Sequence, residues 1–239
     1  MDLKIFEDNN QLSTFTAEFI INYVKQKPKS VIVVPSGDSP KLTFQKIVDL
    51  SDPSIFDEAT IIGLDEWVGI SPENEGSCGN FIRKFLIEPL NNPKLQTYFF
   101  NQLADDLESE CEKMNQFIES KGGIDIMLVG IGLNGHIGLN EPNTDWNLYA
   151  HLSELAEMTI TVGQKYFAES TELKYGITLG LKHLQESKHP ILIANGAKKA
   201  EIISETINGK VSIDNPSTIF QTMSHSHFWL DASAASMLK

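Results

Sequence analysis

Cysteine is nearly absent from this sequence of 239 residues, which contains only Cys78 and Cys111. Two cysteines are too few for a disulfide framework, so we interpret them as reduced thiols of a cytoplasmic protein. The first residues, MDLKIFEDNN, lack a basic stretch followed by an apolar run, which predicts no signal peptide. A long apolar run is missing too, and a membrane span needs about 20 such residues. We therefore expect a cytoplasmic protein without a membrane partner.

Positive charge is also scarce, because 19 Lys and Arg stand against 32 Asp and Glu, a formal net charge of −13. Nucleic-acid binding ordinarily needs a basic surface, so this balance argues against a nucleic-acid partner. An anionic small molecule would have to be held by backbone N–H groups and a few placed cations. No internal repeat, low-complexity tract or long linker is visible, which predicts one large domain over residues 1–239.

What the sequence does contain is an alternation of short β-branched runs with longer helical patterns, typical of βαβ units. The expected strands cover residues 30–35, 60–65, 125–132, 190–195 and 227–231, with a weaker sixth at 97–100. Helices are expected over 12–23, 103–118, about 40–50, 78–90 and 197–208, the last one stopped by Gly209. The simplest architecture is a single doubly wound, mainly parallel, Rossmann-like α/β sheet with helices on both faces. In such sheets ligands bind beyond the carboxyl ends of the strands.

The loop after the first of these strands contains Ser36, Gly37, Asp38 and Ser39. Ser39 is expected as the N-cap of the following helix, with Pro40 in its first turn. A Ser/Gly turn that opens a helix presents free backbone N–H groups at the positive end of the helix dipole, which suits an anion. An ordinary capped loop explains the same residues. The carboxylate of Asp38 weakens the anion interpretation, because it repels a phosphate unless it points away.

Two further strand ends have charged pairs. Asp65 and Glu66 follow the strand at 60–65, where carboxylates are frequent catalytic candidates, although a solvated N-cap is the alternative. Lys198 and Lys199 occupy the first turn of the helix expected over 197–208. Cations there oppose the helix dipole, which favours an anion at the helix end. Solvated surface lysines are the ordinary alternative.

The stretch VGIGLNGHIGLNEP, residues 129–142, begins with a literal G-x-G-x-x-G. A dinucleotide-binding loop requires these glycines to lead directly into a helix, and Gly138 and Pro142 make a long helix unfavourable. We therefore reject a dinucleotide cofactor. A glycine-rich turn with His136 and Glu141 five residues apart suits an acid–base pair instead. A histidine that merely caps the turn is the alternative.

Together these stretches resemble the glucosamine-6-phosphate deaminase family, which shares its fold with the 6-phosphogluconolactonases. The resemblance runs along almost the whole chain, through PSGDSP, LDEWVG, GIGLNGHIGLNEP, YGITLGL, GAKKA and NPSTIFQ. Asn-Glu-Pro after the histidine, at residues 140–142, is typical of the deaminases, and the lactonases typically lack it. Trp67, Cys78 and the stretch GITLGLK are more similar to the galactosamine-6-phosphate isomerase (deaminase) branch.

The resemblance implies a deaminating aldose–ketose isomerase. Such an enzyme opens the ring of an amino sugar 6-phosphate, moves a proton from C2 to C1, and releases ammonia and a ketose 6-phosphate. By the resemblance His136 is the acid–base group of ring opening, Glu141 and Asn134 orient its imidazole, and Asp65 is the proton shuttle. An imidazole titrates near neutral pH in its unperturbed state, which suits this role.

The resemblance also places the substrate phosphate on residues 36–39 and on Lys199, with Lys165 where an arginine often stands. A lysine there loses the planar bidentate contact of an arginine. Many members have Asp where this chain has Asn134, whose amide oxygen can accept the imidazole N–H but cannot offset its positive charge. No metal and no organic cofactor is implied, and a homo-oligomer is left open.

Three functions remain to be distinguished. The first is the deaminase, with galactosamine 6-phosphate favoured over its C4 epimer, glucosamine 6-phosphate. The second is a sugar lactone hydrolase of the 6-phosphogluconolactonase type that acts through His136. The third is a sugar-phosphate sensor without turnover, which the combination of Asp65, His136 and Glu141 disfavours.

Overall fold

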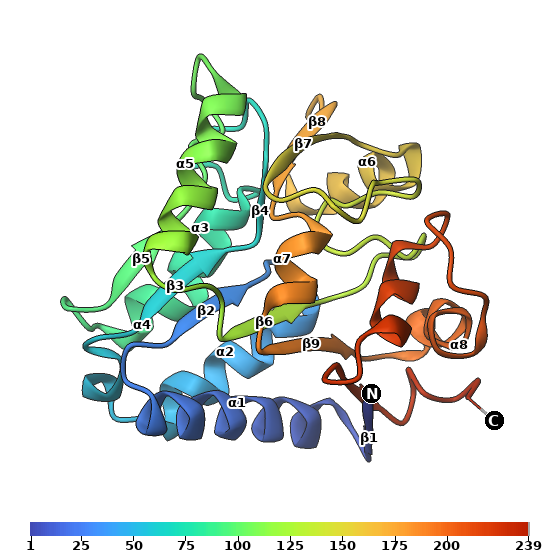
Figure 1. Cartoon of the computed structure of the whole chain (residues 1–239), viewed down its shortest axis with the longest axis horizontal. Helices are drawn as coiled ribbons and strands as arrows, with labels where there is room; N and C mark the ends of the chain where they lie inside the picture. Colours follow the sequence, from blue (N-terminus) through green and yellow to red (C-terminus); the bar gives the residue numbers. More distant parts are fainter. Residues whose placement is uncertain (239) are drawn as a thin grey trace.

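The computed structural model describes residues 1–238 and has the α/β architecture that the sequence predicts (Figure 1). A parallel sheet contains seven strands in the order β1-β10-β9-β6-β2-β3-β5. These strands are β1 (Asp2–Phe6), β2 (Val31–Val34), β3 (Thr60–Gly63), β5 (Gln96–Tyr98), β6 (Ile126–Val129), β9 (His189–Ala194) and β10 (His227–Asp231). All six strands expected from the sequence are present, and β1 is an addition at the edge.

Helices cover both faces of this sheet. On one face lie α1 (Asn9–Gln26), α2 (Asp38–Leu50), the short η1 (Pro53–Phe56) and the consecutive turns α3 (Cys78–Ile82), η2 (Arg83–Ile87) and α4 (Glu88–Leu90). On the other lie α5 (Leu107–Ser120), α7 (Leu181–Glu186), α8 (Ala200–Asn208) and η5 (Pro216–Thr222). Figure 1 shows α1 along one side of the sheet and α5 and α7 on the opposite side. Because both faces are covered, the central strands β2, β3, β6 and β9 are buried along nearly their whole length, whereas the edge strands β1 and β5 are partly exposed.

The strand order creates a crevice between β2 and β6. From β2 the chain moves outward through β3 to β5, and it then returns to the other side of β2 at β6 and moves outward through β9 to β10. The loops after β2 and β6 therefore leave the sheet in opposite directions. In open parallel sheets ligands bind at this point, beyond the carboxyl ends of the strands.

A second, antiparallel sheet adds β4 (Asp65–Trp67), β8 (Tyr175–Thr178) and β7 (His151–Glu154), and the sequence did not predict it. Helix α6 (Glu157–Gly163) and the single turn η3 (Gln164–Tyr166) lie between β7 and β8 in the chain. Figure 1 shows β7, β8 and α6 grouped together, apart from the main sheet. The strand expected over 60–65 ends at Gly63, so that Asp65 begins the second sheet and pairs with Thr178.

Some helix boundaries differ from the expectation because of their caps. Helix α2 begins at Asp38, with Gly37 rather than Ser39 as its N-cap. The carboxylate of Asp106 accepts the backbone N–H of Ser109 and starts α5 at Leu107, four residues after the expected start at 103. The stop of α8 at Gly209 is confirmed, and η4 (Ala197–Lys199) precedes that helix. Within residues 1–238 no helix is both long enough and apolar enough to span a bilayer.

Candidate active site

A cavity of about 170 Å³ opens at the crevice predicted by the strand order. Its walls come from the loops after β2, β3, β6 and β9 and from the segment of α6 and η3. The residues expected in the site from the sequence meet here. Lining the cavity are Ser36, Gly37, Asp38, Ser39, Asp65, Asn134, His136, Lys165 and Lys199. Glu141, the remaining expected residue, lies behind the histidine.

The glycines of residues 130–138 form the seat of His136. A Cβ atom on Gly132 would overlap the imidazole ring, so the ring lies directly against the backbone of this residue. Gly135 has a φ of +83°, a left-handed conformation that favours glycine, and its N–H closes the turn on the carbonyl of Gly132 at 3.1 Å. The stretch continues as turns and not as a helix, in agreement with the rejection of a dinucleotide loop.

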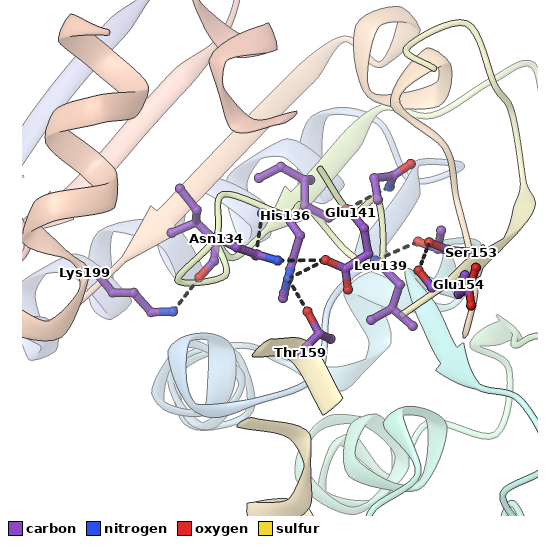
Figure 2. Close-up of polar contacts among 12 residues, drawn as sticks. Asn134, His136, Leu139, Glu141, Ser153, Glu154, Thr159 and Lys199 are labelled. Carbon is purple, nitrogen blue, oxygen red and sulfur yellow. Dashed lines mark hydrogen bonds and ion pairs between the residues drawn. The ribbon is translucent and has the colours of Figure 1, made fainter. Parts of the chain in front are cut away.

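The imidazole of His136 has two polar neighbours at Nδ1 (Figure 2). Oγ1 of Thr159 lies 3.0 Å from Nδ1, and Oε2 of Glu141 lies 3.6 Å from it. Asn134 connects His136 with Glu141, but through other contacts than expected. Its Nδ2 donates to Oε2 of Glu141 at 2.8 Å, and its Oδ1 accepts the backbone N–H of His136 at 3.2 Å. The amide therefore fixes the backbone of the histidine and the carboxylate, rather than accepting from the ring.

Glu141 is a buried carboxylate that stays ionised. Its burial acts to raise its pKa, but the neighbouring His136, Thr159 and Asn134 side chains outweigh burial and lower the pKa. With 5 % of its surface exposed, Glu141 places a negative charge beside the imidazole that water screens poorly. Such a charge stabilises the imidazolium when the ring takes up a proton.

Asp65 lies on the opposite wall, at the start of β4. Its backbone pairs with Thr178, and Oδ2 would lie 3.4 Å from a Cβ on Gly138. The other carboxylate oxygen, Oδ1, is buried without a hydrogen-bond partner among residues 1–238. Burial first, and then the charge of Glu66, raise the pKa of Asp65 to about 7, against a smaller lowering by Cys78. A carboxyl group with this pKa exchanges protons readily near neutral pH, as a general base requires.

The neighbouring Glu66 has a structural role. Side chains alternate along a strand, so Asp65 and Trp67 line the cavity while Glu66 points away from it. The Glu66 carboxylate accepts the Ser77 hydroxyl at 2.6 Å and the backbone N–H groups of Cys78 and Gly79 at 2.9 and 2.8 Å. It thereby stabilises the first turn of α3, as an anion at a helix N-terminus does. Of the two carboxylates, only Asp65 faces the cavity.

The opposite end of the cavity suits an anion. Gly37 has a φ of +99° and opens α2, whose first backbone N–H groups have no partner within the helix. Lys199 reaches the cavity and donates to the carbonyl of Ile131 at 2.5 Å, while Lys198 is exposed. Burial, and then the charge of Lys165, lower the pKa of Lys199 to about 8. The Asp38 carboxylate pairs with Lys165, whose Nζ lies 2.7 Å from Oδ2.

Sequence reasoning missed several cavity residues. Thr159 and Tyr166 come from α6 and η3, where no helix was expected. Cys78, which was not assigned as a nucleophile, lines the cavity as well, and burial followed by the charges of Glu66 and Asp65 raises the pKa of its thiol well above its usual range. A thiol held in its neutral form is a poor nucleophile. The spacing of 23 residues between His136 and Thr159 contains no signal of their contact.

The sequence is similar to a known protein family over most of its length. The model of the family described as glucosamine-6-phosphate isomerases/6-phosphogluconolactonase matches residues 7–229. The glucosamine-6-phosphate deaminase of Geobacillus sp. (strain WCH70) is 34% identical over 225 residues, which are 92% of this chain and 90% of that protein. The glucosamine-6-phosphate deaminase of Thermoanaerobacter sp. (strain X514) is 32% identical over 241 residues, 100% of this chain and 95% of that protein.

Solved structures agree with the sequence comparison. A monomeric glucosamine-6-phosphate deaminase superimposes with a TM-score of 0.94 at 30% identity, covering 99% of this chain and 100% of that chain. A 6-phosphogluconolactonase from Trypanosoma brucei superimposes with a TM-score of 0.80 at 16% identity, covering 100% of this chain and 98% of that chain. The second similarity concerns the fold alone.

Proposed function

Because the chain belongs to the family of glucosamine-6-phosphate isomerases and 6-phosphogluconolactonases, we propose that it deaminates an amino sugar 6-phosphate to a ketose 6-phosphate and ammonia. The main support is a single cavity with three features. A carboxylate of near-neutral pKa, Asp65, and an imidazole, His136, face it, and an anion site of α2 and Lys199 lies at one end. This combination offers proton transfer at the sugar carbons and binding of a phosphate.

Ring opening is assigned to His136. The imidazole takes the proton of the anomeric O1 hydroxyl and delivers a proton to the ring oxygen O5, so that the C1–O5 bond breaks and an open-chain aldehyde results. The imidazole of His136 is protonated between these two transfers. The ionised Glu141, 3.6 Å from Nδ1, stabilises this intermediate charge. Asn134 keeps the carboxylate in place through its 2.8 Å hydrogen bond.

The isomerisation and deamination are assigned to Asp65. Its carboxylate removes the proton from C2, and the electron pair shifts to O1 to give an enolate with the amino group on C2. The same carboxyl group returns the proton to C1 while the nitrogen lone pair forms the C2=N bond, and a proton of the resulting iminium passes to O1, which leaves an imine at C2. Water then adds to C2 and ammonia departs, giving the C2 ketone. One carboxylate serves both carbons because they are adjacent.

The substrate phosphate is assigned to the loop of residues 36–39, Lys199 and Lys165. The N-terminus of α2 supplies backbone N–H donors and Lys199 supplies a partly buried cation. Lys165 pairs with Asp38 at 2.7 Å, so a phosphate has to share or take over this lysine. A lysine makes a single-point contact with a phosphate, whereas an arginine makes a bidentate one. The other donors that converge on this site compensate for the difference.

Galactosamine 6-phosphate is the favoured substrate in this proposal. The sequence features that resemble the galactosamine branch include Trp67 and Cys78, and both side chains line the cavity. The relatives compared above bear the name of glucosamine-6-phosphate deaminase, so glucosamine 6-phosphate is the alternative.

The test measures ammonia and ketose 6-phosphate from both amino sugar phosphates with purified protein. We expect ammonia from at least one of them, more from galactosamine 6-phosphate, and a loss of about 10²- to 10⁴-fold in kcat for Asp65→Asn. Asp49→Asn, an exposed aspartate of α2, is the matched control and keeps full activity. No ammonia from either sugar would refute the proposal. Hydrolysis of a sugar lactone that survives Asp65→Asn would point to a lactonase instead, because that reaction needs no base at C2.

A further inference from the structure

The hydroxyl of Thr159 is the nearest polar group to the imidazole of His136. Its Oγ1 lies 3.0 Å from Nδ1, within hydrogen-bond range, whereas Oε2 of Glu141 lies at 3.6 Å, beyond it (Figure 2). These two groups occupy Nδ1, which leaves Nε2 as the nitrogen available to a ligand. Thr159 is 4 % exposed, so water does not compete for its contact with the ring.

A hydroxyl is suited to both protonation states through which the ring passes. It donates to Nδ1 when this nitrogen has no proton and accepts from it when a proton is present. The ionised Glu141 can only accept. Thr159 and Glu141 both approach Nδ1, at 3.0 and 3.6 Å, so the hydroxyl and the carboxylate lie beside the same ring nitrogen. Neither a valine nor an alanine at this position offers that contact.

Thr159 also joins the histidine to the phosphate end of the cavity. It belongs to α6, which continues directly into η3. At η3 the side chain of Lys165 lies 2.7 Å from Asp38, and the hydroxyl of Tyr166 would lie 3.1 Å from a Cβ on Gly37. One segment, residues 157–166, therefore touches His136 at one end and the loop of residues 36–39 at the other.

We propose that Thr159 is a positioning residue for His136, and that an anion on the loop of residues 36–39 strengthens its contact with the ring. This inference rests on the proposed function. The phosphate of the substrate then promotes ring opening at the far end of the sugar, because it fixes the segment that holds the imidazole. Binding energy from a non-reacting part of a substrate is commonly used in this way.

The experiment compares Thr159→Val with Thr159→Ser and with Thr161→Val. Thr161 is an exposed residue of the same helix, so its substitution changes the helix equally without touching the imidazole. We expect kcat/KM for the amino sugar 6-phosphate to fall about tenfold in Thr159→Val, the effect of one lost hydrogen bond. Thr159→Ser and Thr161→Val stay close to the wild type. Should Thr159→Val fail to fold by circular dichroism, Thr159→Ala replaces it in the same comparison.

Two measurements distinguish a positioning role of Thr159 from a non-specific effect of its substitution on the structure. The first is the isotope effect on kcat/KM with substrate deuterated at C2. When ring opening becomes slow, the later transfer of the C2 proton limits the rate less, so the isotope effect falls toward one in Thr159→Val. The second is the rate with an unphosphorylated amino sugar, with and without inorganic phosphite. Phosphite accelerates the wild type and Thr161→Val, but not Thr159→Val.

Equal kinetics of Thr159→Val and wild type would overturn the role of Thr159, as would a slower variant with an unchanged or larger isotope effect. A wild type that phosphite does not accelerate would overturn the link to the phosphate loop. These failures differ from failure of the proposed function, in which the wild type itself releases no ammonia from either amino sugar phosphate.

Discussion

At the residue scale, the proposed reaction depends on two side chains whose pKa values are shifted toward neutral pH from opposite directions, in both cases by burial and a like charge. Burial and the charge of Glu66 disfavour the anionic form of Asp65 and raise its pKa to about 7. Burial and the charge of Lys165 disfavour the cationic form of Lys199 and lower its pKa to about 8. Asp65 has to be deprotonated to act as a base, and Lys199 has to be protonated to attract a phosphate. Both conditions hold together in the interval between these values.

The acidic limb of the pH profile therefore belongs to Asp65. We expect kcat/KM of the wild type to fall as the pH drops below about 7, since protonation removes the base. The measurement is ammonia release from the better amino sugar phosphate between pH 5 and 9. The residual activity of Asp65→Asn should be flat across the same acidic range. A profile that remains level down to pH 5 in the wild type would contradict the assignment.

The alkaline limb belongs to Lys199. Above about pH 8 its amine loses the proton, and the attraction to the phosphate dianion is lost with it. KM for the phosphorylated amino sugar should rise severalfold between pH 7 and 9. An unphosphorylated amino sugar is the control, because its KM does not depend on Lys199. A parallel rise of KM for both sugars would show that another group is responsible.

At the element scale, the main sheet was predictable because its central strands, such as VIVV and IMLV, are apolar runs between longer helical patterns. The second sheet was not, since β4, β7 and β8, with the sequences DEW, HLSE and YGIT, are short and mix polar with apolar residues. Helix α6 lacks both signals of a helix. Its stretch EMTITVG is rich in β-branched residues, and its N-cap, Ala156, supplies no side-chain hydrogen bond. Thr159 and its contact with His136 were missed for that reason.

The glycine-rich loop after β6 can hold the imidazole of His136 because residue 132 has no side chain. Gly132 has no Cβ because the imidazole of His136 occupies that space. We expect Gly132→Ala to displace the ring and to lower kcat by about 10²-fold, the usual effect of a shift of about 1 Å in a reacting group. Asp49→Asn, an exposed aspartate of α2 outside the cavity, is the control. Steady-state kinetics of both variants provide the check, and equal loss in both would refute the specific role of Gly132.

At the scale of the whole molecule, the site forms where the strand order reverses. The sequence indicated which loops contain candidate site residues, but not which loops lie next to one another in the fold. Because β9, β6, β2 and β3 are adjacent, the loops that contain Lys199, His136, residues 36–39 and Asp65 meet at one edge of the sheet. That order depends on long-range pairing, which no local pattern encodes. The resemblance to a family implied that these loops share one site, whereas the residue patterns gave only the general rule that ligands bind at carboxyl ends.

The opposite end of the sheet contains a charge cluster on which the stability of the whole molecule depends. Asp125, just before β6, has a side chain that is 1% exposed and accepts from Lys27 at 2.6 Å, from Lys188 at 2.8 Å and from the backbone N–H of Val31 at 2.9 Å. It thus ties together the end of α1 and the starts of β2, β6 and β9. Burial acts to raise the pKa of Asp125, but these hydrogen bonds outweigh burial and lower it.

A lowered pKa in the folded state means that Asp125 stabilises the fold above the pKa of an unfolded aspartate, about 4, and that this contribution is lost as the pH falls through the folded value. We expect Asp125→Asn to reduce the free energy of unfolding by about 1–3 kcal/mol at pH 7, since it weakens the charge-assisted hydrogen bonds with Lys27 and Lys188, whose side chains are 41% and 55% exposed. Urea unfolding at pH 7 and at pH 3 measures the difference, which should narrow at the lower pH because wild-type Asp125 then becomes protonated. Asp49→Asn, on the exposed side of α2, should change little at either pH. A difference between Asp125→Asn and wild type that stays constant with pH would mean that the residue stabilises the fold by packing and not by its charge.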